Sequence, residues 1–107
     1  MKTLIDDLDI YYRDRVRLVK SIMKRESEDE YPSLLKWKLQ MLYFDGGKWI
    51  EICRIDNYLH EGLIGSHVHI GKKIKRVEMS IEEAEKKIEE ISSRLLKERF
   101  GEDINEN

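Results

Sequence analysis

The sequence predicts an α+β domain in which an antiparallel meander of about four strands is covered on one face by a C-terminal helix. Three observations indicate this fold: a helical apolar stripe near the C-terminus, a two-residue alternation around residue 40, and a glycine turn that joins two extended runs. A chain of 107 residues is long enough for one hydrophobic core. We therefore expect residues 1–107 to form a single domain, with flexible ends at residues 1–8 and 102–107.

The composition is typical of a soluble globular protein. Charged residues make up 39% of the chain and hydrophobic residues 40%, which is too apolar for disorder and too polar for a bilayer. The formal charge of −2 excludes a uniformly basic protein that coats nucleic acid. The single cysteine excludes an internal disulfide, and no segment has the pattern of a signal peptide or a membrane span. We expect a cytoplasmic protein without a membrane partner, and the abundance of Glu, Lys, Arg and Ile is typical of a thermophile.

The first quarter of the chain fits two patterns. Val16, Leu18 and Ile22 have the spacing of an edge strand, which we favour for residues 14–25. A second set of apolar residues has helical spacing, so both a strand and a helix are possible for residues 4–25. This set is Leu4, Leu8, Tyr12, Val16, Val19 and Met23. The acidic run Glu26–Glu30, followed by Tyr31-Pro32, predicts a solvated loop before the next strand.

A β-hairpin follows this loop. Apolar and polar residues alternate from Leu35 to Tyr43, which is the two-residue period of a half-buried strand. Asp45-Gly46-Gly47 provides a tight turn, and the next run is rich in Trp, Ile and Cys. The sequence therefore predicts strands at residues 34–44 and 48–56.

A short strand and a helix complete the predicted fold. Residues 67–70 form the fourth strand, which continues after Gly71 through Ile74 toward Met79. Ser80 and Glu83 form a capping box at the start of a helix over residues 81–100. Apolar residues at spacings of three and four give that helix one stripe, which packs on the sheet. The sheet edges, together with an exposed Trp37 or Trp49, would support a homodimer.

The histidines are the most informative local feature. His60, His67 and His69 lie within ten residues of one another, and an extended segment at residues 66–70 turns His67 and His69 to one face and Val68 and Ile70 to the core. Such a pair binds a divalent metal ion with His60, Asp56 or Glu61 as third ligand, or acts as general acid and base in phosphodiester cleavage, or is purely structural. These three alternatives stay open.

The charge distribution favours a polyanionic substrate near the histidines. Residues 33–79 carry eight Lys and Arg against five Asp and Glu, whereas residues 80–107 carry five against nine. Lys72, Lys73 and Arg76 follow the histidines directly and are candidates for phosphate contacts, although lysines on an edge strand also prevent aggregation. If the site is catalytic, His67 and His69 open to solvent in a concavity that also holds Asp56 and one of these cations.

Two further residues have structural interpretations. Cys53 lies between Ile52 and Arg54 in a predicted strand, and we expect a buried small side chain there rather than a nucleophile. Arg54 and Asp56 share a strand face, so we expect an ion pair between them.

The order of these features resembles a family of small archaeal and bacterial proteins that are toxin-like members of toxin–antitoxin pairs. The resemblance covers roughly residues 35–95 and depends on Asp56-Asn57, Gly65 and His67-x-His69, with Ile55 and Ser66 where the family pattern has Tyr and Asp. It implies an intracellular protein that works beside a small antitoxin-like partner and acts on RNA, with Asp56, His67 and His69 as its site.

Two functions therefore stand as hypotheses. The first is a toxin-like protein that binds or cleaves RNA, a ribonuclease in which His67 and His69 move protons or hold a divalent metal ion. The second is a non-catalytic interaction module or structural domain that uses an exposed sheet edge and the acidic helix face.

Overall fold

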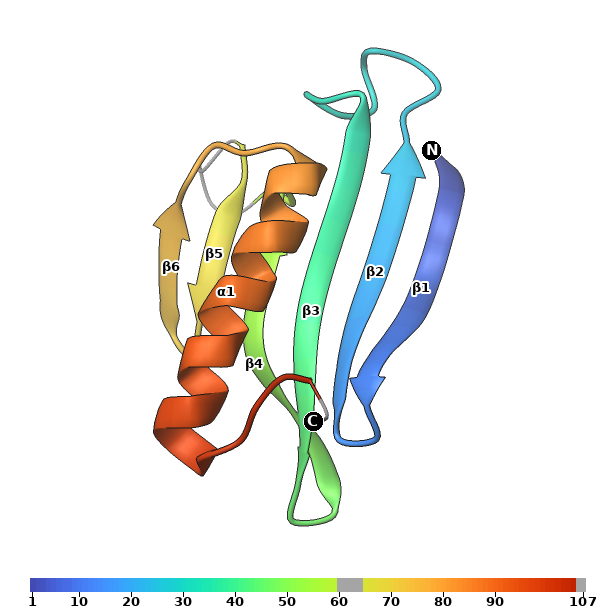
Figure 1. The fold of residues 1–107 in the computed structure, drawn as a ribbon. Helices are drawn as coiled ribbons and strands as arrows, with labels where there is room; N and C mark the ends of the chain where they lie inside the picture. Colours follow the sequence, from blue (N-terminus) through green and yellow to red (C-terminus); the bar gives the residue numbers. More distant parts are fainter. Residues whose placement is uncertain (60–64, 106–107) are drawn as a thin grey trace.

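The computed structural model describes residues 1–59 and 65–105, and these form an antiparallel sheet with one helix on one face (Figure 1). The strands follow one another across the sheet in chain order, so the fold is an α+β meander as predicted. The sequence analysis predicted about four strands, and the described residues form six. The elements are β1 (Lys2–Arg13), β2 (Val16–Lys24), β3 (Leu35–Asp45), β4 (Lys48–Asp56), β5 (His67–Ile70), β6 (Lys73–Arg76) and α1 (Ile81–Phe100).

Local sequence accounts for the hairpin and the helix. Gly46 and Gly47 both have positive φ, at 58° and 86°, which permits the tight turn between β3 and β4. At the start of α1, the Ser80 side chain accepts a hydrogen bond from the Glu83 backbone N–H, and the Glu83 carboxylate accepts one from the Ser80 N–H. Gly101 ends the helix in the left-handed conformation, with φ of 66°. The predicted bounds of the helix are confirmed.

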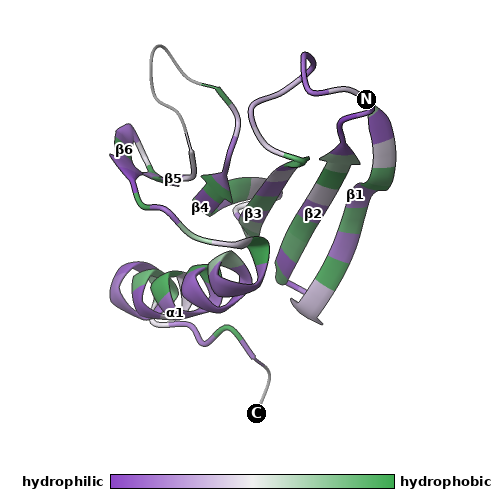
Figure 2. Cartoon of the chain, turned by 90° about the horizontal axis from the view of Figure 1, so that it is seen from above, coloured by the Kyte–Doolittle hydropathy of each residue, from purple (hydrophilic) through white to green (hydrophobic). Residues whose placement is uncertain are grey.

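The core lies between α1 and the face of the sheet formed mainly by β3 and β4. The stripe of α1 contributes Ala84, Ile88 and Leu96, none of which is exposed, and Leu39 of β3 and Ile55 of β4 lie opposite with the same complete burial. The interface between helix and sheet is apolar on both sides. In Figure 2, hydrophobic residues alternate with hydrophilic ones along the strands above α1. In the described part of the chain, no helix is long and apolar enough to cross a membrane.

The N-terminal region differs most from expectation. Residues 2–13 form β1, an edge strand paired with β2, so residues 2–8 belong to the sheet and are not a free end. At the other terminus Ile104 is buried against the core. An exposed Trp37 or Trp49 was expected for dimer formation. Trp37 is only 5% exposed, because its side chain points to the helix side of the sheet, and Trp49 is partly buried.

Candidate functional site

The candidate site lies on the face of the sheet that points away from α1. In the pairing of β4 with β5, Arg54 is opposite His69 and Asp56 is opposite His67. Ile55 and Val68 form the pair between them and belong to the core under the helix. Since side chains alternate along a strand, the four polar residues share the second face. The prediction that both histidines lie on one face with Asp56 is confirmed; Arg54, Asp56, His67 and His69 are called the polar cluster below.

Asp56 is the anionic centre of the polar cluster. Its Oδ2 lies 3.1 Å from Arg54 Nε and 3.2 Å from His69 Nε2. Its Oδ1 accepts a hydrogen bond of 3.0 Å from the backbone N–H of Tyr58. The Asp56 side chain is 1% exposed, and these charge-assisted contacts compensate for that burial. The expected ion pair between Arg54 and Asp56 is confirmed.

The neighbours of His69 determine which ring nitrogen carries the proton. Arg54 Nη2 lies 3.2 Å from His69 Nδ1. A guanidinium group only donates hydrogen bonds, so Nδ1 must be the acceptor and must have no proton. The ring proton is therefore on Nε2, where it faces the Asp56 carboxylate. The positions of Arg54 and Asp56 therefore favour the tautomer of His69 with its proton on Nε2.

His67 completes the polar cluster. Its ring centroid lies 6.3 Å from that of His69, with an angle of 69° between the ring planes. On its other side His67 is opposite Arg76 of β6, whose side chain is 58% exposed and lies 3.6 Å from Glu78. The two imidazoles are thus neighbours, and His67 lies between Asp56 of β4 and Arg76 of β6.

The expected opening of the two histidines to solvent is wrong. His67 is 0% exposed and His69 is 4% exposed, and neither lies under the helix. The chain leaves β4 on the side away from α1 (Figure 2). The Asn57 side chain anchors this exit, because its Oδ1 accepts from the Trp37 N–H at 2.8 Å and its Nδ2 donates to the Leu35 carbonyl at 2.7 Å.

Two tyrosines beside the polar cluster have a raised pKa. Burial and, next, the negative charge of Asp56 raise the pKa of the Tyr31 phenol. The same two causes raise the pKa of Tyr58. The Tyr31 hydroxyl donates to the Asn57 carbonyl, and the Lys36 ammonium lies 4.5 Å from the centre of the Tyr58 ring. These contacts fix residues 57 and 58 beside Asp56.

The three cations that we predicted as phosphate contacts do not form one group. Arg76 shares a face with His67, but Lys73 is opposite Ile70 and points to the helix side. Lys72 lies in the turn between β5 and β6. The alternation of the strand separates Lys73 from the histidines, so of these three only Arg76 lies beside the polar cluster.

Two residues of the motif, Asn57 and Gly65, have structural roles that the sequence does not reveal. Asn57 was noted as part of a motif, but its role as the anchor between β3 and the exit of β4 depends on contacts across the sheet. Gly65 has φ of 95°, and a Cβ atom there would lie 2.4 Å from Glu78 Oε2. The backbone conformation therefore favours glycine at position 65, whereas the exposed Glu78 side chain can move away from a Cβ atom.

The metal hypothesis is not supported by the described residues. Residues 1–59 and 65–105 contain no group of three His, Cys, Asp or Glu side chains that could hold a metal ion. His60 and Glu61, which we considered as third ligands, lie outside the described residues. In the described chain, His69 lies between the Asp56 carboxylate and the Arg54 guanidinium group.

Cys53 is confirmed as a buried side chain, with 0% exposure on the helix side of β4. Burial, with a smaller contribution from the charge of Glu51, raises the pKa of the Cys53 thiol to about 12. We expect no reaction with a thiol reagent such as Ellman's reagent in the folded protein at neutral pH, and complete reaction after unfolding in guanidinium chloride. Rapid labelling of the native protein would contradict this burial.

Comparisons with family models, with curated proteins and with solved structures find no match for this chain.

Proposed function

We propose that this protein is a toxin-like intracellular ribonuclease whose polar cluster performs acid–base cleavage of RNA. The observation that carries the proposal is the arrangement around His69, where a carboxylate holds one ring nitrogen and an arginine occupies the other. A neutral imidazole with a carboxylate behind it is a general base, because the carboxylate stabilises the imidazolium that forms. A second imidazole at 6.3 Å between ring centres supplies the acid partner.

The polar cluster supports one balanced reaction. Arg54 moves from His69 Nδ1 to a phosphate oxygen of the RNA, and Nδ1 then takes the proton of the ribose 2′-hydroxyl. The 2′-oxygen forms a bond to phosphorus while the bond from phosphorus to the 5′-oxygen breaks, and protonated His67 gives its proton to that 5′-oxygen. The products are a 2′,3′-cyclic phosphate and a 5′-hydroxyl, and Arg54 neutralises the charge that develops on phosphorus.

Arg54 is the group that a substrate meets first. Its side chain is 30% exposed, whereas Asp56 beneath it is 1% exposed. A phosphate that approaches this face competes with Asp56 and His69 for the guanidinium, and Arg forms paired hydrogen bonds with phosphate readily. Because His67 and His69 are buried, the condition stated above for a catalytic site is not met, and cleavage requires the polar cluster to rearrange when a phosphate binds Arg54.

The same burial favours a second candidate, which is a non-catalytic interaction module. A polar cluster closed from solvent also serves to fix the connection between β4 and β5, and in that case binding occurs elsewhere on the surface. The resemblance would then imply only a protein that contacts RNA or a small antitoxin-like partner. An RNA cleavage assay separates the ribonuclease from the non-catalytic module.

The test is RNA cleavage by wild type and by the double variant His67→Ala/His69→Ala, purified identically. We expect at least about a 10²-fold loss of cleavage in the double variant, and unchanged cleavage in Ser93→Ala on α1, a control on the opposite side of the sheet. The wild-type products should carry 2′,3′-cyclic phosphate ends, and EDTA should leave the rate unchanged. Equal cleavage by wild type and double variant removes the ribonuclease proposal, and inhibition by EDTA replaces the acid–base route with a metal-dependent one.

A further inference from the structure

The two edges of the sheet carry opposite charges. β1 is one edge strand, and its central part contains Asp6, Asp7 and Asp9 with no Lys or Arg between Lys2 and Arg13. β6 is the other edge strand of the described sheet, and three of its four residues are Lys or Arg. An acidic edge and a basic edge on one molecule attract each other between two copies.

The edges also hold most of the exposed apolar surface. The described residues include eight exposed large hydrophobic side chains, of which four belong to β1 and one to β6; these five are Leu4, Leu8, Ile10, Tyr11 and Ile74. The stripe along β1 is visible at the edge of the sheet in Figure 2. Apolar side chains gathered on an edge strand are typical of a surface that binds another chain.

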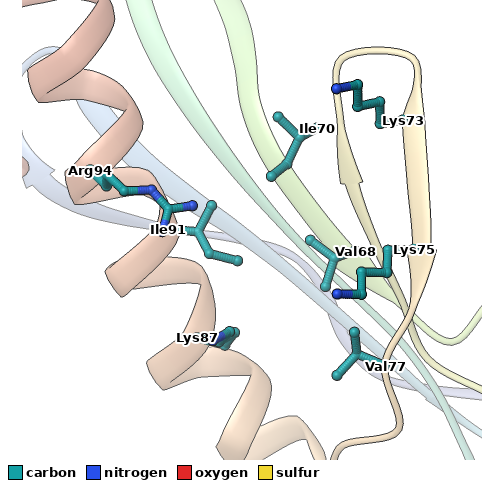
Figure 3. Close-up of a pocket in the computed structure, with 8 residues that line it drawn as sticks. All are labelled: Val68, Ile70, Lys73, Lys75, Val77, Lys87, Ile91 and Arg94. Atoms are coloured by element: carbon teal, nitrogen blue, oxygen red, sulfur yellow. The ribbon is translucent and has the colours of Figure 1, made fainter.

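A groove beside β6 extends the basic edge. It has a volume of about 430 Å³ and lies between α1 and the strands β5 and β6 (Figure 3). Its floor is aliphatic, and its rim carries four cations, Lys73, Lys75, Lys87 and Arg94. None of the eight lining residues is acidic, and among the described residues only Lys87 of these four cations has an ion pair, at 3.8 Å from Glu90.

The segment that matches this groove is the second half of β1. Leu8 to Tyr11 pair with β2 without a bulge, and this regular stretch has the same length of four residues as β6. Leu8 is opposite Lys20, which forms an ion pair with Glu85 of α1, so Leu8 and Ile10 lie on the helix side. Lys73 and Lys75 lie on that same side of β6.

We propose that β1 of a second copy of this chain adds to β6 as the next antiparallel strand. Antiparallel pairing continues the alternation of the meander, so Leu8 and Ile10 of the second copy remain on the helix side, beside the aliphatic floor of the groove. Asp9 of the second copy lies on the other face, the face of Arg76, so its attraction to Lys73 and Lys75 acts across the edge of the sheet. The contact is head-to-tail, because each molecule uses a different edge toward each of its two neighbours.

Charge disfavours the two symmetric alternatives. A dimer through β1 alone would bring the aspartates of two acidic strands together, and a dimer through β6 alone would bring two lysine-rich strands together. Like charges opposite each other destabilise paired strands. If instead the lysines of β6 only prevent aggregation, the protein remains monomeric at all concentrations.

The test is analytical ultracentrifugation of the full chain and of two single-edge variants. Lys73→Glu/Lys75→Glu reverses the charge of the β6 edge, and Leu8→Lys/Ile10→Lys removes the apolar stripe of the β1 edge and repels β6. All four side chains are on exposed strand positions, and circular dichroism verifies the fold of each variant. We expect wild type to associate with increasing concentration in low salt and to dissociate in high salt.

The decisive sample is the equimolar mixture. Each variant alone is expected to remain monomeric, whereas the mixture forms a complex of two chains, because the intact β1 of the first variant pairs with the intact β6 of the second. A monomeric wild type in low salt overturns the proposal. So does self-association that persists in both variants, or that is lost in only one of them, since a symmetric dimer uses one edge alone.

Discussion

Replacing Asp56 with alanine is expected to lower the free energy of unfolding by about 3 kcal/mol, because the change removes the anion from a buried pair and leaves its partners without an acceptor. Arg54 Nε, His69 Nε2 and the Tyr58 N–H all face Asp56 within 3.2 Å. Urea unfolding at neutral pH measures the loss.

Glu51 provides a matched control for this prediction. It is the other carboxylate near Arg54, at 3.7 Å, but its side chain is 29% exposed. Removing an exposed partner changes stability little, so Glu51→Ala is expected to cost less than about 0.5 kcal/mol. Similar losses in both variants would show that the burial of Asp56 adds nothing to its interaction with Arg54.

Replacing Leu39 with alanine is expected to cost about 3 kcal/mol, through lost burial and the cavity that remains. Leu39 is 0% exposed at the centre of the sheet, where it lies between Lys20 of β2 and Ile55 of β4 and packs in the core formed with α1. The midpoint of urea unfolding should fall while the m-value stays unchanged.

Leu34→Ala is the control for the core prediction. Leu34 precedes β3 and is 54% exposed, so the same chemical change should cost less than about 0.5 kcal/mol. Equal losses for the two leucines would contradict the packing of α1 against this face of β3.

The helix and the hairpin were predictable because their signals are local. The capping box at Ser80 and the glycine at Gly101 mark both ends of α1, and Gly46-Gly47 marks the turn between β3 and β4. In each of these elements the apolar residues recur with a single period, which is two residues along β3 and three to four residues along α1. Short-range rules of this kind require no knowledge of the neighbouring elements.

β1 and β6 were not predictable in the same way. The pairing of β1 with β2 shifts between Thr3 and Ile5 and again between Ile5 and Leu8. Each shift offsets the alternation, so the apolar residues of β1 recur at spacings that imitate a helix. The strand predicted at residues 67–70 was expected to continue after Gly71, but the chain turns there and β6 returns antiparallel to β5. The four exposed residues of β6 have no apolar pattern that marks this reversal.

The candidate site was predictable in composition but not in environment. Alternation along β5 places His67 and His69 on one face, and alternation along β4 places Arg54 with Asp56. The register that brings the two pairs together is a long-range feature, and so are the Asn57 contacts with β3 at the exit of β4. The expected exposure of the histidines was wrong for this reason.

The account depends on His69 being held between Arg54 and Asp56 as a neutral ring with its proton on Nε2. Nitrogen-15 NMR of the folded, histidine-labelled protein at neutral pH measures this directly, with His69→Gln to assign the resonance. We expect a protonated Nε2 and an unprotonated Nδ1 for His69. A proton on Nδ1, or a pair of ring nitrogens that exchange between tautomers as in a free imidazole, would contradict the geometry on which the proposed base is founded.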